Sequence, residues 1–142
     1  MRAVLDTVIF VRALINPHGA CGLILDDLQH KYTIILSPDI IREIMDVTRR
    51  SSLEVKLGVS GDAPPVDRVL GLIQDAEVIE PGIELDVCRD PKDNKFFECA
   101  VAASADYIVS EDRDLLDVGE FEGVRTVNAA DFVKLLRRLP LN

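Results

Sequence analysis

Acidic and polar side chains recur in this chain where predicted secondary-structure elements begin or end. Asp6 follows a short apolar run at the N-terminus, and Glu43 lies nearly two turns inside a helix predicted to begin after Ser37. A second group lies at the start of a later predicted helix and consists of Asp90, Asp93 and Asn94. A third group follows a later apolar run and consists of Ser110, Asp112 and Asp114. Carboxylates gathered in one place repel one another unless a cation neutralises them. Oxygen donors without His or Cys at ligand spacing suit Mg²⁺ or Mn²⁺ better than zinc, so these acids predict a divalent-cation site.

Most of these acids also have an ordinary structural explanation. Asp93 is placed to complement the N-terminus of a helix, Asp112 is a common turn residue, and Glu43 fits an exposed helix position. Asp6 differs from them, because a charge directly after a buried strand is costly without a partner or a function. Asp6 is therefore the acid for which a chemical role is expected most strongly.

The elements that must position these acids alternate along the chain. Apolar runs predict strands at 3–5, 32–36, 77–79, 107–109 and 124–127. Helical spacing follows at 10–28, 37–50, 66–73, 90–104 and 128–136, with a loop at 58–65. This alternation predicts an α/β fold built from right-handed βαβ units, with a parallel sheet and helices on both faces. The carboxyl ends of parallel strands line a ligand crevice, where acids from four segments would meet.

Composition narrows the class of protein. The 142 residues are 48% hydrophobic and 29% charged, which excludes disorder, coiled coil and collagen and fits one domain over 1–142. The chain has 25 acids and 16 bases, a net charge of −9, so phosphate backbones are repelled on average. A nucleic-acid role would need a local basic patch or a bridging cation. Three cysteines without CxxC spacing predict neither a disulfide framework nor a zinc ribbon, but buried thiols.

The first strand begins without a basic leader, and no apolar run approaches the ~20 residues of a membrane span. A cytoplasmic location without membrane contact is therefore expected.

Three segments resemble the PIN-domain family, the metal-dependent nucleases that include VapC-type toxins. The opening VLDTVIFVRALINPHG resembles the family's first acidic segment, and SPDIIREIMDV its second. The stretch DPKDNKFFECAVAASADYIVSEDRDLL is similar to the third and fourth and is the most specific. The resemblance covers nearly the whole chain in order. It implies a three-layer α/β/α sandwich with a parallel sheet of about five strands.

The resemblance also implies roles for individual residues. The catalytic acids and metal ligands would be Asp6, Glu43, Asp93 and Asp112, with Glu43 binding the ion directly or through water. Supporting residues would be Ser110, Asp90, Asn94 and Asp114. Together they imply a metal-dependent endoribonuclease, in which water activated by one or two Mg²⁺ or Mn²⁺ ions hydrolyses RNA phosphodiester bonds.

Partners follow from the same resemblance. A family toxin is neutralised by a cognate antitoxin, and homodimers are common, so both are expected here. Apolar residues at 40–47 and 53–59 could serve these contacts, although the core is the more ordinary place for them. Basic residues near the acids are candidates for binding RNA, with a solvated helix face as their alternative: Arg12, Arg42, Lys92, Lys95 and Arg113.

One departure from the family pattern leaves a second hypothesis open. The usual Asp-Thr-Asn is Asp6-Thr7-Val8 here, although all four acids remain. The alternative function is a PIN-like module that binds RNA or a partner with little or no turnover. Metal-dependent cleavage of single-stranded RNA separates the two hypotheses.

Overall fold

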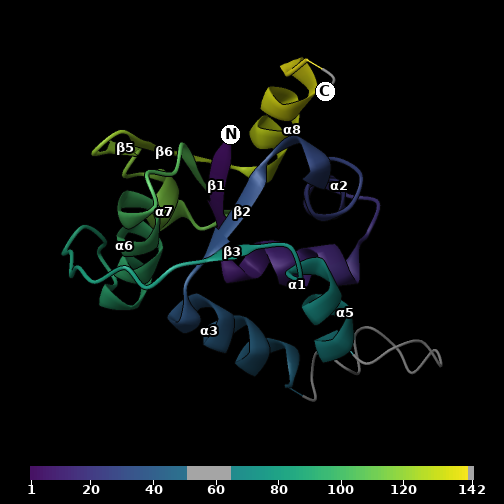
Figure 1. Ribbon diagram of the computed structural model, residues 1–142, viewed down its shortest axis with the longest axis horizontal. Coiled ribbons are helices and arrows are strands. Elements are labelled where there is room, and N and C mark those ends of the chain that lie inside the picture. The colour runs from purple at the N-terminus through teal and green to yellow at the C-terminus, as the bar shows by residue number, and fades with distance from the viewer. Residues whose placement is uncertain (51–64, 141–142) are drawn as a thin grey trace.

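The computed structural model describes residues 1–50 and 65–140, and these residues form one six-stranded sheet with flanking helices (Figure 1). The strand order is β3-β2-β1-β4-β6-β5. Five strands are parallel, and β5 pairs antiparallel with β6 at one edge. The strand bounds are β1 Arg2–Leu5, β2 Thr33–Leu36, β3 Glu77–Val78, β4 Tyr107–Val109, β5 Glu120–Phe121 and β6 Val124–Val127. The predicted α/β fold with five parallel strands is confirmed, and an additional edge strand is present.

The additional strand β5 depends on a tight turn into β6. Glu122 and Gly123 both have positive φ, 48° and 84°. This is the backbone that a two-residue hairpin turn of type I′ requires at both central positions, and Phe121 pairs with Val124 across it. Glu-Gly is a weaker signal for such a turn than Asn-Gly or Asp-Gly, so the sequence pattern does not reveal this hairpin.

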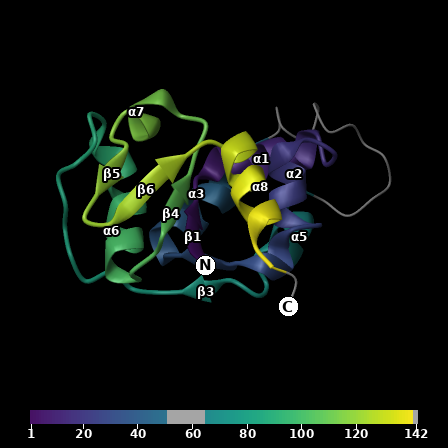
Figure 2. The ribbon, with the colours of Figure 1, turned by 90° about the horizontal axis from the view of Figure 1, so that it is seen from above.

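Helices cover both faces of the sheet. Figure 2 shows α6 on one side and α1, α2, α5 and α8 on the other, which gives the expected three layers. Helix α3 lies near the carboxyl ends of the strands, where it contacts α1, α5 and α6 (Figure 1). The helix bounds are α1 Thr7–Ile15, α2 Ala20–Leu25, α3 Pro38–Thr48, α5 Pro65–Leu72, α6 Asn94–Ala102, α7 Arg113–Leu116 and α8 Ala129–Arg138, with short 3₁₀ helices η1 Gln29–Lys31 and η2 Pro91–Asp93.

The central strand β1 carries the chain through the middle of the core. Ala3, Val4 and Leu5 are fully buried, because helices cover both faces of the parallel sheet. The next residue, Asp6, continues the pairing with β4 through its backbone N–H, which donates to the carbonyl oxygen of Val109 at 3.0 Å. The first acid is thus fixed at the centre of the sheet's carboxyl edge.

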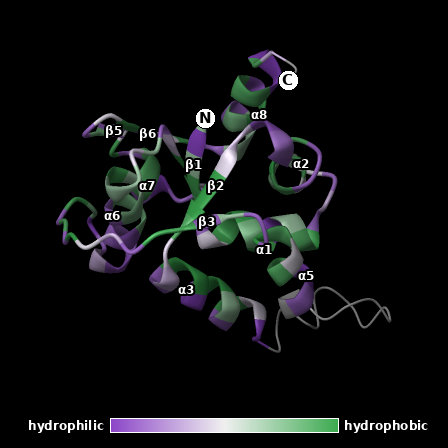
Figure 3. Cartoon of the chain, in the orientation of Figure 1, coloured by the Kyte–Doolittle hydropathy of each residue, from purple (hydrophilic) through white to green (hydrophobic). Residues whose placement is uncertain are grey.

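Hydrophobic residues of the strands and helices form one core cluster. Figure 3 shows hydrophobic segments on the strands and on the helices around them. The ring of Phe132 packs edge-on against Tyr32 and Tyr107, with centroid distances of 5.1 and 5.9 Å. Burial raises the pKa of the three thiols, to about 11 or 12, so they stay protonated as the small apolar core residues that were predicted: Cys21, Cys88 and Cys99.

Two expectations fall outside the described residues. These are the apolar stretch at 53–59 and the predicted loop at 58–65, apart from Pro65, at which α5 begins. Among the helices that the structure describes, none has the length and apolar character needed to cross a membrane.

Candidate functional site

Asp6 is a buried carboxylate at the end of β1. Its residue is only 5% exposed, and its Oδ2 accepts a hydrogen bond from Ser110 Oγ at 2.7 Å. Burial raises the pKa of Asp6 above its ordinary value, and repulsion by Glu43 and Asp112 raises it further. The Ser110 hydroxyl and the backbone N–H of Val8 act in the opposite direction. Burial and repulsion therefore make the charged form of Asp6 costly.

Ser110 joins the first and last acids of the site. It directly follows β4, is fully buried, and both donates to Asp6 and accepts from the backbone N–H of Asp112 at 2.9 Å. Asp112 in turn caps α7, because its Oδ1 accepts from the backbone N–H of Asp114 at 2.9 Å. The predicted turn role of Asp112 is thus present, and the same geometry places it beside Asp6.

Asp93 stands at the N-terminus of α6, as the sequence pattern predicts. Burial is the largest influence that raises its pKa, to about 6, and repulsion by Asp112, Asp90 and Asp6 adds to it, while Lys95 lowers it. The mutual influence of these side chains means that acids from three separate segments share one electrostatic environment. Asp90 itself is exposed and caps η2, where its Oδ1 accepts from the backbone N–H of Lys92 at 3.0 Å.

Asn94 anchors the loop that leads to Asp93. Its buried Oδ1 accepts from the backbone N–H groups of Val87 and Cys88 at 3.0 and 2.8 Å. This anchoring fixes the preceding chain against α6 and thereby the position of Asp93. Asp114 lies at the edge of the site, where its Oδ1 is 3.7 Å from a guanidinium nitrogen of the exposed Arg89.

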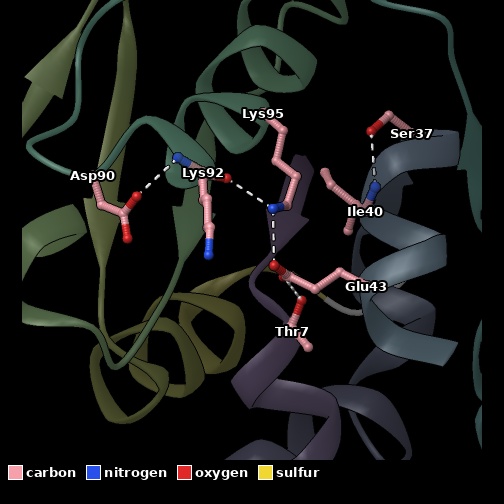
Figure 4. Close-up of polar contacts among 7 residues, drawn as sticks. All are labelled: Thr7, Ser37, Ile40, Glu43, Asp90, Lys92 and Lys95. Atoms are coloured by element: carbon pink, nitrogen blue, oxygen red, sulfur yellow. Dashed lines mark hydrogen bonds and ion pairs between the residues drawn. The ribbon is translucent and has the colours of Figure 1, made fainter. Parts of the chain in front are cut away.

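Glu43 is held from both sides. Its Oε2 accepts a hydrogen bond from Thr7 Oγ1, and its Oε1 pairs with Lys95 Nζ at 2.8 Å (Figure 4). The three residues come from α3, α1 and α6, so this contact ties together the helices around the carboxyl edge of the sheet. Glu43 belongs to the same acidic environment, since its charge raises the pKa of Asp6.

Three of the five basic residues expected near the acids line one groove. Arg42, Lys92 and Lys95 border an open groove of about 680 Å³ between α3 and the segment leading into α6. Acidic residues line the same groove: Asp39, Glu43, Asp46, Glu84 and Glu98. Arg12 lies elsewhere and lines a second hollow of about 380 Å³ beside α1 and α2. Arg113 is exposed at the start of α7. The structure thus brings the basic residues of α3 and α6 together and leaves Arg12 apart from them.

The residues that form this site lie within a segment that matches a known protein family. The model described as PIN domain matches residues 2–114, which include all four expected acids. The chain belongs to the PIN domain family. PIN domains are in general nucleases, so this chain is a member of a nuclease family.

Relatives and solved structures agree with this assignment. The PIN domain is 34% identical over 120 residues to the uncharacterized protein MJ1680 of Methanocaldococcus jannaschii, covering 83% of this chain and 75% of that protein. Its fold is similar to VapBC2 from Rickettsia felis bound to a promoter DNA fragment, with 19% identity, TM-score 0.56, and coverage of 90% and 98%. It is also similar to PAE2754 from Pyrobaculum aerophilum, with 14% identity, TM-score 0.61, and coverage of 98% and 100%. At these identities the two structures support the fold.

The donor set of this PIN domain fits a hard divalent cation in chemistry. The side chains that raise one another's pKa values are all carboxylates, and no imidazole is among the groups that influence Asp6 and Asp93. In the described part of the chain, no three acidic, His or Cys side chains are gathered closely enough to hold an ion as they stand. Asp6, Asp93 and Asp112 would hold an ion only with their carboxylates closer together than they are here, and the positive charge of the ion would offset the repulsion between them.

Two residues of the site escape reasoning from the sequence alone. Thr7 donates its hydroxyl to Glu43, and Glu98 lines the groove and accepts from the backbone N–H of Leu85 at 2.9 Å. The available signal for Thr7 is a hydroxyl directly after the first acid. For Glu98 the signal is its spacing of three and four residues from Lys95 and Asn94, which puts the three side chains on one helix face.

We expect removal of the Asp93 charge to stabilise the metal-free PIN domain at pH 7. Because folding raises the pKa of Asp93 from 3.8 to about 6, the folded state binds a proton between these values that the unfolded state does not. Protonation of Asp93 therefore contributes to the free energy of unfolding at low pH, and this stabilisation is lost as pH rises through 6. Asp93→Asn should therefore raise the free energy of unfolding at pH 7 by about 1–2 kcal/mol, after allowance for solvent screening.

Urea denaturation in EDTA at pH 5, 6 and 7 measures this effect as the difference between variant and unaltered protein. The difference should be largest at pH 7 and shrink toward pH 5. The exposed Asp75 provides a matched control, since Asp75→Asn should change stability little at any of these pH values. A difference for Asp93→Asn that does not vary with pH would contradict the prediction.

Proposed function

We propose that this PIN domain is a metal-dependent endoribonuclease and the toxin of a toxin–antitoxin pair. The observation that carries the proposal most is the buried Asp6 carboxylate, linked through Ser110 to Asp112 within the matched PIN region. A protein that used these acids only as caps and turn residues would gain nothing from burying Asp6 among like charges. A cation at this place accounts for the burial.

Asp6, Asp93 and Asp112 would hold one or two Mg²⁺ or Mn²⁺ ions, with Glu43 beside them. Bound there, such an ion supplies an activated water and charge for a scissile phosphate. The chain's own residues orient the site. Ser110 fixes Asp6 and the backbone of Asp112, and the supporting residues Asn94 and Asp90 order the segment around Asp93.

The departure at Val8 is compatible with activity. Its side chain is 37% exposed, and its backbone N–H favours the charged form of Asp6. This N–H is present whichever amino acid occupies the position, so the change from the usual Asn leaves the support of Asp6 in part intact.

RNA would lie along the groove bordered by Arg42, Lys92 and Lys95. A cognate antitoxin is supported by the likeness to VapBC2, whose structure contains promoter DNA. A homodimer, a cytoplasmic location and a single domain over 1–142 stay predictions of the sequence. Arg12 and Arg113 also stay candidates for RNA contacts outside the groove.

The test is cleavage of a pool of labelled single-stranded RNAs by purified protein with Mn²⁺, with Mg²⁺ and with EDTA. We expect internal cleavage with at least one metal and none with EDTA, because the acids cannot polarise water without a cation. Asp93→Asn should cleave far more slowly, and Asp75→Asn should match the unaltered protein. No cleavage by a protein that binds Mn²⁺ would favour the alternative, a PIN-like module that binds RNA or a partner.

A further inference from the structure

Lys95 is a largely covered cation with a fixed position. Its side chain is 17% exposed, and its ammonium donates to Glu43 Oε1 at 2.8 Å and to the carbonyl oxygen of Lys92 at 2.7 Å. The same nitrogen lies 5.3 Å from the centre of the Phe96 ring. An ammonium has three N–H donors, so one remains after these two hydrogen bonds. The charge is therefore held in place with one donor left for a further acceptor (Figure 4).

Glu43 is arranged to hold Lys95 more than to bind an ion. Thr7 donates to one carboxylate oxygen and Lys95 to the other, so each oxygen already has a donor. A cation that bound Glu43 directly would share the carboxylate with the Lys95 ammonium, whose positive charge repels it, or would have to break this partly covered ion pair. Such a pair loses more on separation than a solvated surface pair does.

The position of Lys95 answers the electrostatic problem of this site. The chain has a net charge of −9, and Asp93 precedes Lys95 by two positions, so an RNA phosphate that approaches the acids meets repulsion. Arg42 borders the same groove, but its side chain is 70% exposed and pairs with Asp39 on the surface. A fixed, partly desolvated ammonium contributes more to binding an anion than a mobile exposed one.

We propose that Lys95 binds an RNA phosphate beside the metal-binding acids, and that Glu43 acts by positioning Lys95 and not as a direct metal ligand. The inference rests on the proposed function in that it takes RNA as the substrate. It concerns binding, so it can be tested without turnover.

The experiment measures RNA and Mn²⁺ binding separately. Anisotropy of a fluorescein-labelled single-stranded RNA pool is followed in EDTA at several salt concentrations, and Mn²⁺ binding is followed by calorimetry without RNA. Lys95→Met should weaken RNA binding about tenfold and reduce the slope of log affinity against log salt by about 0.7, the value for one lost phosphate contact on a single strand. Lys95→Arg should keep most of the RNA affinity, because it retains the charge.

For Mn²⁺, Glu43→Gln should retain affinity within about twofold, whereas Asp93→Asn should lose more than about tenfold. The matched control is Lys134→Met on α8, an exposed lysine paired with Asp131, which makes the same charge change away from the groove. Circular dichroism and thermal denaturation check that every variant is folded.

Two results would overturn the inference: RNA binding by Lys95→Met equal to that of Lys134→Met, or a loss of Mn²⁺ affinity in Glu43→Gln as large as in Asp93→Asn. Absence of RNA binding by the unaltered protein would overturn it as well. RNA binding without cleavage in Mn²⁺ would contradict the proposed nuclease activity alone, and the anisotropy data would still decide the role of Lys95.

Discussion

Asp6→Asn is expected to reduce metal-dependent RNA cleavage by about 100-fold or more, because changing a residue that only supports a metal ligand already costs about 10- to 100-fold. The same substitution should leave the thermal midpoint of the metal-free protein unchanged or higher. Asn keeps an oxygen that can accept from Ser110 Oγ, so the 2.7 Å hydrogen bond can persist. The substitution removes a buried carboxylate whose pKa is raised by burial and by repulsion from Glu43 and Asp112, so it removes a charge that is costly in the folded state.

The opposite directions of these two effects make the test informative. Cleavage of labelled RNA in Mn²⁺ and thermal denaturation in EDTA would be measured on the same preparations. Asp27→Asn, at an exposed position after α2, provides a control with the same charge change. Retained cleavage in Asp6→Asn would refute the role of Asp6, and a large fall in the midpoint would show that its charge is structural.

Gly22→Ala should lower the free energy of unfolding by about 3 kcal/mol, at the upper end of the cost of overpacking. A Cβ at Gly22 would lie 1.9 Å from the carbonyl oxygen of Pro17 and 2.4 Å from its carbonyl carbon. These are backbone atoms, so no side-chain rotation can relieve the overlap, and α2 would have to move away from the chain that leaves α1. Urea denaturation of both proteins measures the change.

Gly71 in α5 is the matched control, because a Cβ there meets no atom of the described structure within 4 Å. Alanine is the better helix former, so Gly71→Ala should raise stability by up to about 1 kcal/mol. Equal effects of the two substitutions would show that α2 does not pack against Pro17 as closely as described.

The site combines acids that repel one another with a basic side chain, Lys95, that already forms an ion pair with Glu43. Burial, and to a smaller extent repulsion, raises the pKa values of Asp6 and Asp93, whereas Lys95 lowers that of Asp93. A metal ion would relieve the repulsion among the acids, and its positive charge would add to that of Lys95 beside them. The two positive charges together would let a chain of net charge −9 act on a polyanion.

Local signals along the chain were sufficient to predict most of the helices and strands. Apolar runs located the five parallel strands, and Ser37 with Pro38 marked the start of α3, where Ser37 Oγ accepts from the backbone N–H of Ile40 at 3.3 Å. The acid after the first strand and the acids at the start of α6 and α7 were likewise visible, because strand ends and helix caps depend on neighbouring residues. These signals, together with the three segments that resemble PIN domains, predicted the fold and the gathering of acids at the carboxyl edge of the sheet.

Which side chains meet at this edge of the sheet depends on tertiary packing. Glu43 and Lys95 are 52 positions apart, and nothing in either local pattern indicates that they pair or that Thr7 joins them. The packing of Gly22 against Pro17 and the strand β5 are likewise invisible in the pattern. The physical reason is that periodicity and capping are fixed within a few residues, whereas distant contacts depend on how the packed helices and the sheet place those residues in space.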